Sequence, residues 1–374
     1  MLSFIKRTVP LQNQNLELKR IIIATGIVSL AAYILLQIIS PENTLTYSDE
    51  MIRAARIMEN AIVIIREFCD RSDIKIESAI DPNHTGLVGP QLTELATTLG
   101  NLEAKRTTTN PNFAAVIVHL LHEAGVAAGD TIAIGCSASF PALMIASLAA
   151  AKAMELHPII IISVGASSYG ATSPGFNLSY IYEVLLREKI FTVQPGAISL
   201  GGDKDIGGDF EPLIKKKLIQ QIKSSGVPFI YEADLQKNVA MRMKIYQGDS
   251  SRNRISAFIN IGGSYPNIGT SELALKLKPG LNEKISIPPE EERGVIFEMA
   301  DRNIPIIHLL YIRGLALKYG LPWDPIPLPI PGESALLSAQ SHNDFRFWLV
   351  ATSYFLTLVL FVVFGYLKTS FPIN

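Results

Sequence analysis

Small-residue loops follow the most apolar runs of this sequence, and they hold the side chains best suited to chemistry. The loop at 135–139 reads Gly-Cys-Ser-Ala-Ser, and similar glycine- and serine-bearing loops occupy 165–175, 201–208 and 262–264. Backbone N–H groups and hydroxyls in such loops bind carboxylates or phosphates. Any one such loop is more simply a tight turn, but four together favour an anion-binding rim.

We expect the ligand-binding residues to come from these loops and from a basic pair upstream of them. The pair supplies positive charge, and the loops supply hydroxyl and backbone donors. The candidates are Lys105, Arg106, Ser137, Ser139, Ser167, Ser168, Gly201, Gly202, Gly263 and Ser264.

A nucleophilic site is the alternative chemistry. The first loop lies where a hydrolase elbow would, although the pattern G-x-S-x-G needs a glycine in place of Ser139. A triad also needs a base and an acid. The catalytic candidates are the nucleophiles Cys136, Ser137 and Ser139, the base His308, and the acids Asp203 and Asp205.

Cofactor and metal motifs are not found in the sequence. Neither a dinucleotide-binding GxGxxG nor a Walker motif occurs at the first expected strand. The acidic residues at 203–211 do not have the spacing of an EF-hand loop, and His119 with His122 has no ligand-rich partner motif. We therefore expect no cofactor and no metal site.

Apolar runs alternate with helical stretches through most of the chain, and this alternation positions the loops. Strands are expected at 131–134, 159–164, 196–200, 227–231, 255–261 and 304–307, with helices between them. The pattern predicts an α/β fold with a doubly wound, mainly parallel sheet, set between N-terminal and C-terminal transmembrane helices. Parallel strands joined by right-handed crossovers end at one edge of the sheet, so the four loops should lie together.

Other segments surround this α/β core, which we place at 131–320. A helical and polar lead-in region at 40–130 begins with an amphipathic helix at 47–69, for which Ser48 is the expected cap. Closely spaced prolines after the core predict an extended strap at 321–346.

Two uncharged apolar runs, 21–39 and 347–367, have the length of a transmembrane helix. Basic residues precede the first run and acidic residues follow it, so the positive-inside rule places segments 1–20 and 368–374 in the cytoplasm. These observations predict a protein of the bacterial inner membrane with two spans and an extracytoplasmic soluble domain. The cytoplasmic membrane is then one partner.

The charge balance argues against nucleic acid as a partner. The whole chain has a net charge of −1, and the segments outside 21–345 carry six basic residues against one acidic residue, so the part between them is acidic. Nucleic-acid binding requires a basic face. The chain has only 2 cysteines, Cys69 and Cys136, which do not make a disulfide framework.

The combination of terminal apolar helices, Lys105–Pro111, the 135–141 turn and the 165–170 loop resembles the bacterial poly-gamma-glutamate system proteins. The resemblance covers most of the chain but carries over no catalytic motif. It implies a membrane-anchored envelope component whose outer α/β domain binds a carboxylate-rich ligand, with the poly-γ-glutamate polymer or its ligase and export machinery as partner. The alternatives are an envelope hydrolase or transferase acting on the polymer, and a scaffold whose spans bind the partners.

Overall fold

The computed structural model describes residues 11–39, 47–248, 254–333, 336 and 345–370. The chain divides into two compact units, one formed by 1–45 with 338–374 and the other by 46–337. The remaining residues, which include parts of the expected cytoplasmic ends, lead-in region and strap, lie outside the described part.

The larger unit is an α/β fold built on a seven-stranded, mostly parallel sheet. Its strand order is β10-β11-β9-β2-β3-β7-β8, and only β10 is antiparallel to its neighbour. The strands are β2 (Thr131–Ser137), β3 (His157–Ser163), β7 (Ala197–Ser199), β8 (Phe229–Ile230), β9 (Ile255–Ile261), β10 (Gly280–Asn282) and β11 (Ile306–Leu309). The prediction of an α/β fold with a mainly parallel sheet is therefore confirmed.

The strand order reverses direction next to β2. From β2 the chain proceeds through β3 and β7 to β8, and it then returns across the sheet to β9 on the other side of β2. Ligands of open α/β sheets bind outside the carboxyl ends of the strands at such a reversal. The region beyond the carboxyl ends of β2 and β9 is thus the expected place for a site.

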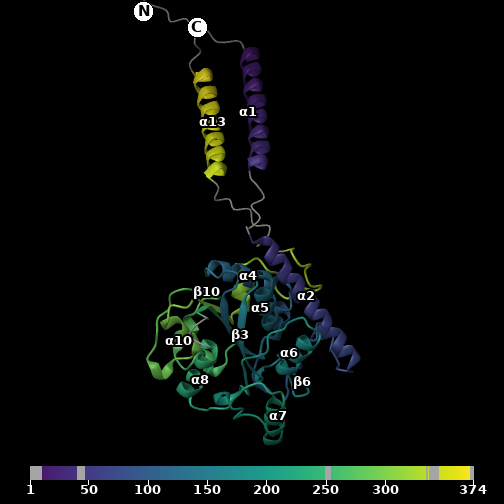
Figure 1. The fold of residues 1–374 in the computed structure, drawn as a ribbon. Helices are drawn as coiled ribbons and strands as arrows, with labels where there is room; N and C mark the ends of the chain where they lie inside the picture. Colours follow the sequence, from purple (N-terminus) through teal and green to yellow (C-terminus); the bar gives the residue numbers. More distant parts are fainter. Residues whose placement is uncertain (1–10, 40–46, 249–253, 334–335, 337–344, 371–374) are drawn as a thin grey trace, which may run out of the picture. The chain divides into compact units, whose positions relative to one another are not determined.

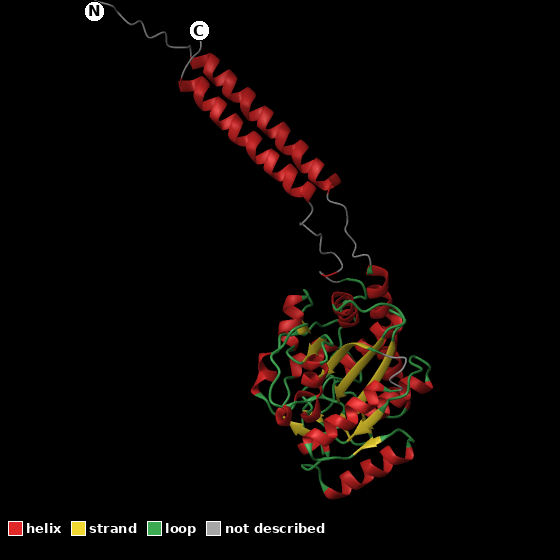
Figure 2. Ribbon diagram, turned by 60° about the vertical axis from the view of Figure 1, so that its left-hand side comes forward, coloured by secondary structure: helices red, strands yellow, loops and turns green. Residues whose placement is uncertain are grey.

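Helices cover both faces of the sheet (Figures 1 and 2). One face is covered by α5 and α6, with α2 packed against α4, α5 and α6, and the other face by α8 and α10. On the second face, apolar side chains of α8 and α10 pack onto residues of β2, β3, β7, β8, β9 and β11. The helices are α2 (Ser48–Arg71), α4 (Asn112–Glu123), α5 (Pro141–Ala153), α6 (Leu178–Arg187), α7 (Pro212–Ser224), α8 (Leu235–Gln247), α10 (Val295–Asp301) and α11 (Ile312–Lys318).

Shorter elements complete the unit. The lead-in region forms β1 (Ala96–Thr98), which pairs in parallel with β4 (Ala166–Ser167), and α3 (Leu102–Thr108). The pair β5 (Thr172–Ser173) and β6 (Phe176–Asn177) is antiparallel. The other short elements are η1 (Asp203–Asp205), α9 (Tyr265–Ile268), η2 (Glu272–Lys276) and η3 (Glu290–Glu292).

The N-terminal cap of α6 is the residue expected from the sequence, whereas the cap of α2 is a different residue. Asn177 caps α6 as its Oδ1 accepts from Ser179 N at 3.0 Å. At α2 the cap position belongs to Tyr47, and the expected cap Ser48 is the first helical residue.

The smaller unit contains α1 (Leu11–Ile39) and α13 (Phe345–Ser370), which lie side by side (Figures 1 and 2). The Ser29 hydroxyl is hydrogen-bonded to the Tyr354 hydroxyl at 2.8 Å. Among the described residues, none of the helices meets the combination of length and hydrophobicity that a membrane-spanning helix requires.

The predicted transmembrane helices at 21–39 and 347–367 are therefore wrong, and so is the inner-membrane localisation with two spans. Both helices extend beyond the apolar runs that motivated the prediction. Helix α1 begins at Leu11 and takes in Lys19 and Arg20, and α13 takes in Arg346 and Lys368.

Candidate functional site

A cavity of about 790 Å³ lies at the carboxyl-terminal edge of the sheet. Residues that follow β2, β3, β7, β9 and β11 contribute to its wall, together with β1, α3 and the strap. The cavity therefore includes the reversal point between β2 and β9. The sheet topology alone explains this position, because all five of these strands run in the same direction.

The four glycine- and serine-bearing loops meet in this cavity. Most of the expected ligand-binding residues line it: Lys105, Ser137, Ser139, Ser167, Gly201, Gly202, Gly263 and Ser264. One close approach holds the loops after β2 and β9 together. Gly262 has φ +80°, and a Cβ at this position would meet Ser137 Oγ at 2.2 Å, so only glycine brings the β2 and β9 loops this near.

Lys105 is a buried charged group of the cavity lining. Asn101 caps α3 by accepting a hydrogen bond from Ala104 N at 2.7 Å, and the helix turns the Lys105 side chain inward, where only 3 % of it is exposed. Its Nζ donates to the carbonyl oxygen of Ser139, forms a 2.7 Å hydrogen bond with Ser167 Oγ, and lies 4.1 Å from the centre of the Phe140 ring.

Burial without a counter-charge changes the acidity of Lys105. Within the described part of the chain, no carboxylate lies within ion-pair distance of its Nζ. Removal of the ammonium from water lowers the pKa of Lys105 to about 7. At neutral pH the side chain therefore exists as a mixture of ammonium and free amine.

Ser139 and Ser167 are held in a fixed arrangement around Lys105. The Ser167 backbone N–H donates to Ser139 Oγ at 3.1 Å, while the Ser139 carbonyl accepts from Lys105. The backbone on either side of Ser167 is bound to the β1 segment, since Ala166 N donates to Leu95 O and Ser168 N donates to Thr98 O. Ser167 is thus positioned by segments that are far apart in the sequence.

Two expected ligand-binding residues lie outside the cavity lining. Arg106 pairs with Asp324 of the strap: its Nε donates to Oδ1 at 2.7 Å, and its Nη2 donates to Oδ2. The Ser168 hydroxyl is buried and donates to Thr98 O at 3.3 Å. Both side chains already have protein partners.

The structure does not assemble the expected triad from its candidates. Cys136 is 1 % exposed, and burial raises the pKa of its thiol well above the ordinary value, so the reactive thiolate is disfavoured. His308 Nδ1 accepts from Asn260 Nδ2 at 3.1 Å, and burial lowers the pKa of His308 to about 4. Within the described residues, no hydrogen bond joins His308 to Cys136, Ser137 or Ser139.

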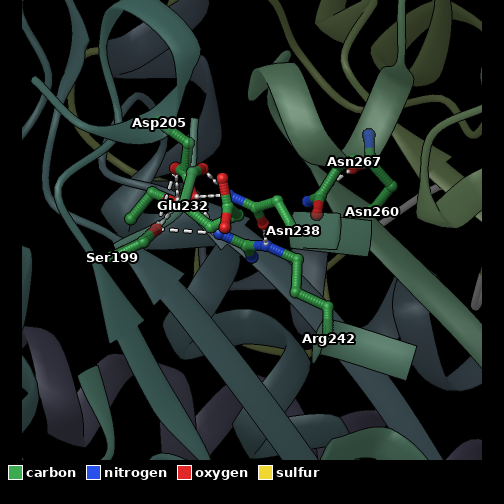
Figure 3. Close-up of polar contacts among 8 residues, drawn as sticks. Ser199, Asp205, Glu232, Asn238, Arg242, Asn260 and Asn267 are labelled. Atoms are coloured by element: carbon green, nitrogen blue, oxygen red, sulfur yellow. Dashed lines mark hydrogen bonds and ion pairs between the residues drawn. The ribbon is translucent and has the colours of Figure 1, made fainter. Parts of the chain in front are cut away.

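The two aspartate candidates have different surroundings. Asp203 is exposed on the cavity wall together with Asp209. Asp205 is buried, and its carboxylate forms an ion pair with Arg242 at 2.6 Å and accepts from Ser199 Oγ at 2.8 Å (Figure 3). Asp205 therefore belongs to a structural network beneath the β7 loop and does not face a ligand.

Sequence reasoning missed several residues of the cavity. Tyr311 and Arg313 follow β11, and Trp323 comes from the strap. The Arg313 guanidinium lies 5.7 Å from the centre of the Trp323 ring. The position of Arg313 in the first turn of the helix that follows a parallel strand was a usable signal, because the segments after parallel strands reach the same edge.

Charges of opposite sign lie at opposite ends of the cavity. Asp203 and Asp209 follow β7, whereas Arg313 follows β11, and β3, β2 and β9 lie between these two strands. At the usual strand spacing this separation is roughly 19 Å. A long ligand that carries several charged groups can contact both ends.

The resemblance to poly-gamma-glutamate system proteins stays a prediction. Comparison of the chain with known protein families, with curated proteins and with solved structures found no match.

Proposed function

We propose that the larger unit binds an extended, carboxylate-rich chain of the poly-γ-glutamate type in the cavity. One observation carries this proposal: Lys105 is a buried cation on the cavity wall for which the described protein supplies no carboxylate. A ligand carboxylate can supply the missing counter-charge, and in a partly desolvated site this interaction is stronger than in water.

The rest of the cavity supports an extended ligand. Four loops bring hydroxyls and backbone groups to one edge, and the exposed Arg313 adds a second positive charge near the β11 end. Asp203 and Asp209 repel a carboxylate at the β7 end but attract an ammonium. A polyanion whose terminal amino group lies near β7 places its ammonium beside Asp203 and Asp209 and its carboxylates near Arg313.

The test is calorimetric titration of the full chain with a poly-γ-glutamate oligomer at pH 6, 7 and 8.5. We expect Lys105→Met to weaken binding at least tenfold at pH 6, since the variant cannot carry the positive charge. In the wild-type protein, affinity should fall as the pH rises past about 7, because Lys105 loses its proton there. The oligomer with its carboxylates converted to methyl esters should not bind.

Lys152→Met is the matched control. Lys152 is an exposed lysine near the C-terminal end of α5, and its Nζ donates to Ile190 O. Its substitution by methionine removes the same charge as Lys105→Met but does not change the cavity lining. Its affinity should equal that of the wild type. Equal affinities for Lys105→Met and the wild type, or binding of the methyl ester, would refute the proposal.

A hydrolase or transferase is the second candidate function. The nucleophiles expected from the sequence do not support it, because Cys136 is buried and, in the described part of the chain, no hydrogen bond joins His308 to Ser137 or Ser139. A different observation favours it, namely the contact between Lys105 and Ser167.

A further inference from the structure

We propose that Ser167 and Lys105 form a nucleophile and general-base pair that transfers acyl groups from amide bonds of an acidic substrate. Ser167 Oγ and Lys105 Nζ are 2.7 Å apart, and both residues line the cavity. Ser167 is partly exposed, whereas Lys105 is almost fully buried behind it. The hydroxyl is therefore accessible from the cavity, and the amine contacts it from the protein side.

A lysine acts as a base only when it is neutral, and the surroundings of Lys105 favour that form. Its pKa is about 7, and desolvation is the cause. The neutral amine can donate one N–H to the Ser139 carbonyl and still offer its lone pair to the Ser167 O–H. Buried lysines of lowered pKa activate serine nucleophiles in this way.

The pair is also held in place by its neighbours. Ser139 fixes both members, since its carbonyl accepts from Lys105 and its hydroxyl accepts from the Ser167 backbone N–H. Gly100 allows the close approach, because a Cβ there would meet the Ser168 carbonyl oxygen at 2.3 Å and Lys105 Cε at 3.2 Å. Ser139 and Gly100 are thus positioning residues, and Ser167 and Lys105 are the proposed catalytic residues.

The reaction balances with water as the only co-reactant. Ser167 Oγ attacks the amide carbonyl carbon, and its proton moves to Lys105 Nζ. The C–N bond breaks, and the leaving amine takes the proton from Nζ, which leaves an acyl ester on Ser167. Water then attacks the ester and gives a proton to Nζ. The C–O bond to Ser167 breaks, Oγ regains the proton, and a carboxylic acid is released; a second amine in place of water would give transfer.

The substrate class rests on the function proposed above, whereas the reactivity of Ser167 does not. A γ-linked glutamate chain has an amide in every link and a carboxylate beside it, so a bound chain brings both groups to the cavity. Binding of a carboxylate favours the protonated Lys105, and reaction requires the neutral form. The two proposals therefore predict opposite pH dependences.

The experiment treats the full chain with an uncharged alkyl fluorophosphonate and follows it by intact-mass spectrometry and peptide mapping. We expect one adduct on Ser167, formed at a rate that rises with pH and reaches half its maximum near pH 7. Ser167→Ala should abolish the adduct, and Lys105→Met should slow its formation at least a hundredfold and remove the pH dependence. Ser147→Ala, which removes a buried hydroxyl of α5 that donates to Leu143 O at 2.8 Å away from the cavity lining, should leave the rate unchanged.

The outcome in the wild-type protein decides the proposal even if a variant fails to fold. Absence of an adduct on Ser167 between pH 6 and 9, or an adduct on another residue alone, would overturn it. Release of coumarin from γ-glutamyl-aminomethylcoumarin then tests the substrate class. Labelling of Ser167 without polymer binding refutes only the proposed ligand, and polymer binding without labelling refutes only the catalytic pair.

Discussion

A lysine that is buried without an acid partner lowers the stability of a folded protein whenever it must remain protonated. Lys105 is in this position, because the folded state lowers its pKa from 10.5 to about 7. Functional sites commonly contain groups whose pKa is displaced by burial in this way. The effect on stability is measurable separately from any ligand.

The pH dependence of unfolding tests the protonation state of Lys105. Between about pH 7 and 10.5 the unfolded chain holds a proton on this side chain that the folded chain lacks, so the free energy of unfolding should rise with pH. The expected slope is at most about 1.4 kcal/mol per pH unit relative to Lys105→Met. Urea titrations of both proteins at several pH values measure the difference, and parallel curves would show that the folded protein keeps Lys105 charged.

At the scale of elements, a buried polar network connects η1, α8 and the end of β7 (Figure 3). Ser163 at the end of β3 joins it through hydrogen bonds to Ser199 Oγ at 2.8 Å and Asp205 Oδ1 at 3.3 Å. Arg242 of α8 pairs with Asp205 of η1, and both side chains are 0 % exposed. Asn238 donates to Asp205 Oδ2 at 3.1 Å and accepts from Arg242 Nε at 2.8 Å. The network holds the β7 loop, and with it Gly201 and Gly202, against the helix layer.

Removing one partner of this ion pair should lower the unfolding free energy strongly. Removing both partners should lower it by less than the two single changes added together. Asp205→Asn leaves the Arg242 charge buried without its counter-charge, and we expect a loss of about 3–5 kcal/mol in unfolding free energy. Arg242→Met should cost a similar amount. The double variant should lose less than the sum of the two, which a double-mutant cycle by urea unfolding measures.

A partly exposed ion pair provides the comparison. Arg293 pairs with Asp301 at 3.2 Å, and 50 % of the Asp301 side chain is exposed. Asp301→Asn should therefore cost less than about 1 kcal/mol. Additive effects of Asp205→Asn and Arg242→Met would contradict the assigned pairing.

At the scale of the whole larger unit, the strap joins the end of the sheet region to the lead-in region. Buried Asn112 of α4 donates to Ile330 O at 3.1 Å and accepts from Gly332 N at 2.9 Å. Arg106 holds Asp324 next to Trp323 of the cavity. These contacts connect residues about two hundred positions apart, so the strap and the cavity wall depend on the same packing.

Loss of the Asn112 side chain should loosen the strap. Asn112→Ala removes the partners of several strap backbone groups, and we expect unfolding free energy to fall by about 1–3 kcal/mol. Trp323 and Trp348 are the 2 tryptophans of the chain, so a Trp348→Phe background lets fluorescence report Trp323 alone.

Urea titration in that background should show the Trp323 transition at lower denaturant for Asn112→Ala. Asn83→Ala is the control, because its amide donates a single bond to Pro325 O and lies in a partly exposed position. The urea midpoint of the Asn83→Ala variant should shift less than that of the Asn112→Ala variant. An unchanged midpoint for Asn112→Ala would show that the strap does not depend on this residue.

The sequence by itself determined the layered architecture and the edge at which the site lies. The runs at 131–134, 159–164 and 255–261 are apolar and bounded by small residues, and each lies within an observed parallel strand or overlaps one closely. Parallel strands place their following loops on one edge whatever the strand order, so the gathering of Ser137, Ser167 and Gly263 followed from local pattern.

Only the tertiary structure decided which side chains face the cavity and which pairs touch. Lys105 and Arg106 are adjacent on α3, where consecutive residues are about 100° apart, so one turns into the cavity and the other toward the strap. Ser167 and Ser168 point to opposite sides of an extended segment, because successive side chains alternate between the two faces of such a segment.

The Lys105–Ser167 contact spans 62 positions and depends on the pairing of β1 with β4. The prediction of two membrane spans from the terminal apolar runs was wrong, because no helix among the described residues combines the length and the hydrophobicity that a span requires. Local composition sets the preferences of a segment, and long-range packing sets the orientation of each side chain, which is why the edge was predictable and the reactive pair was not.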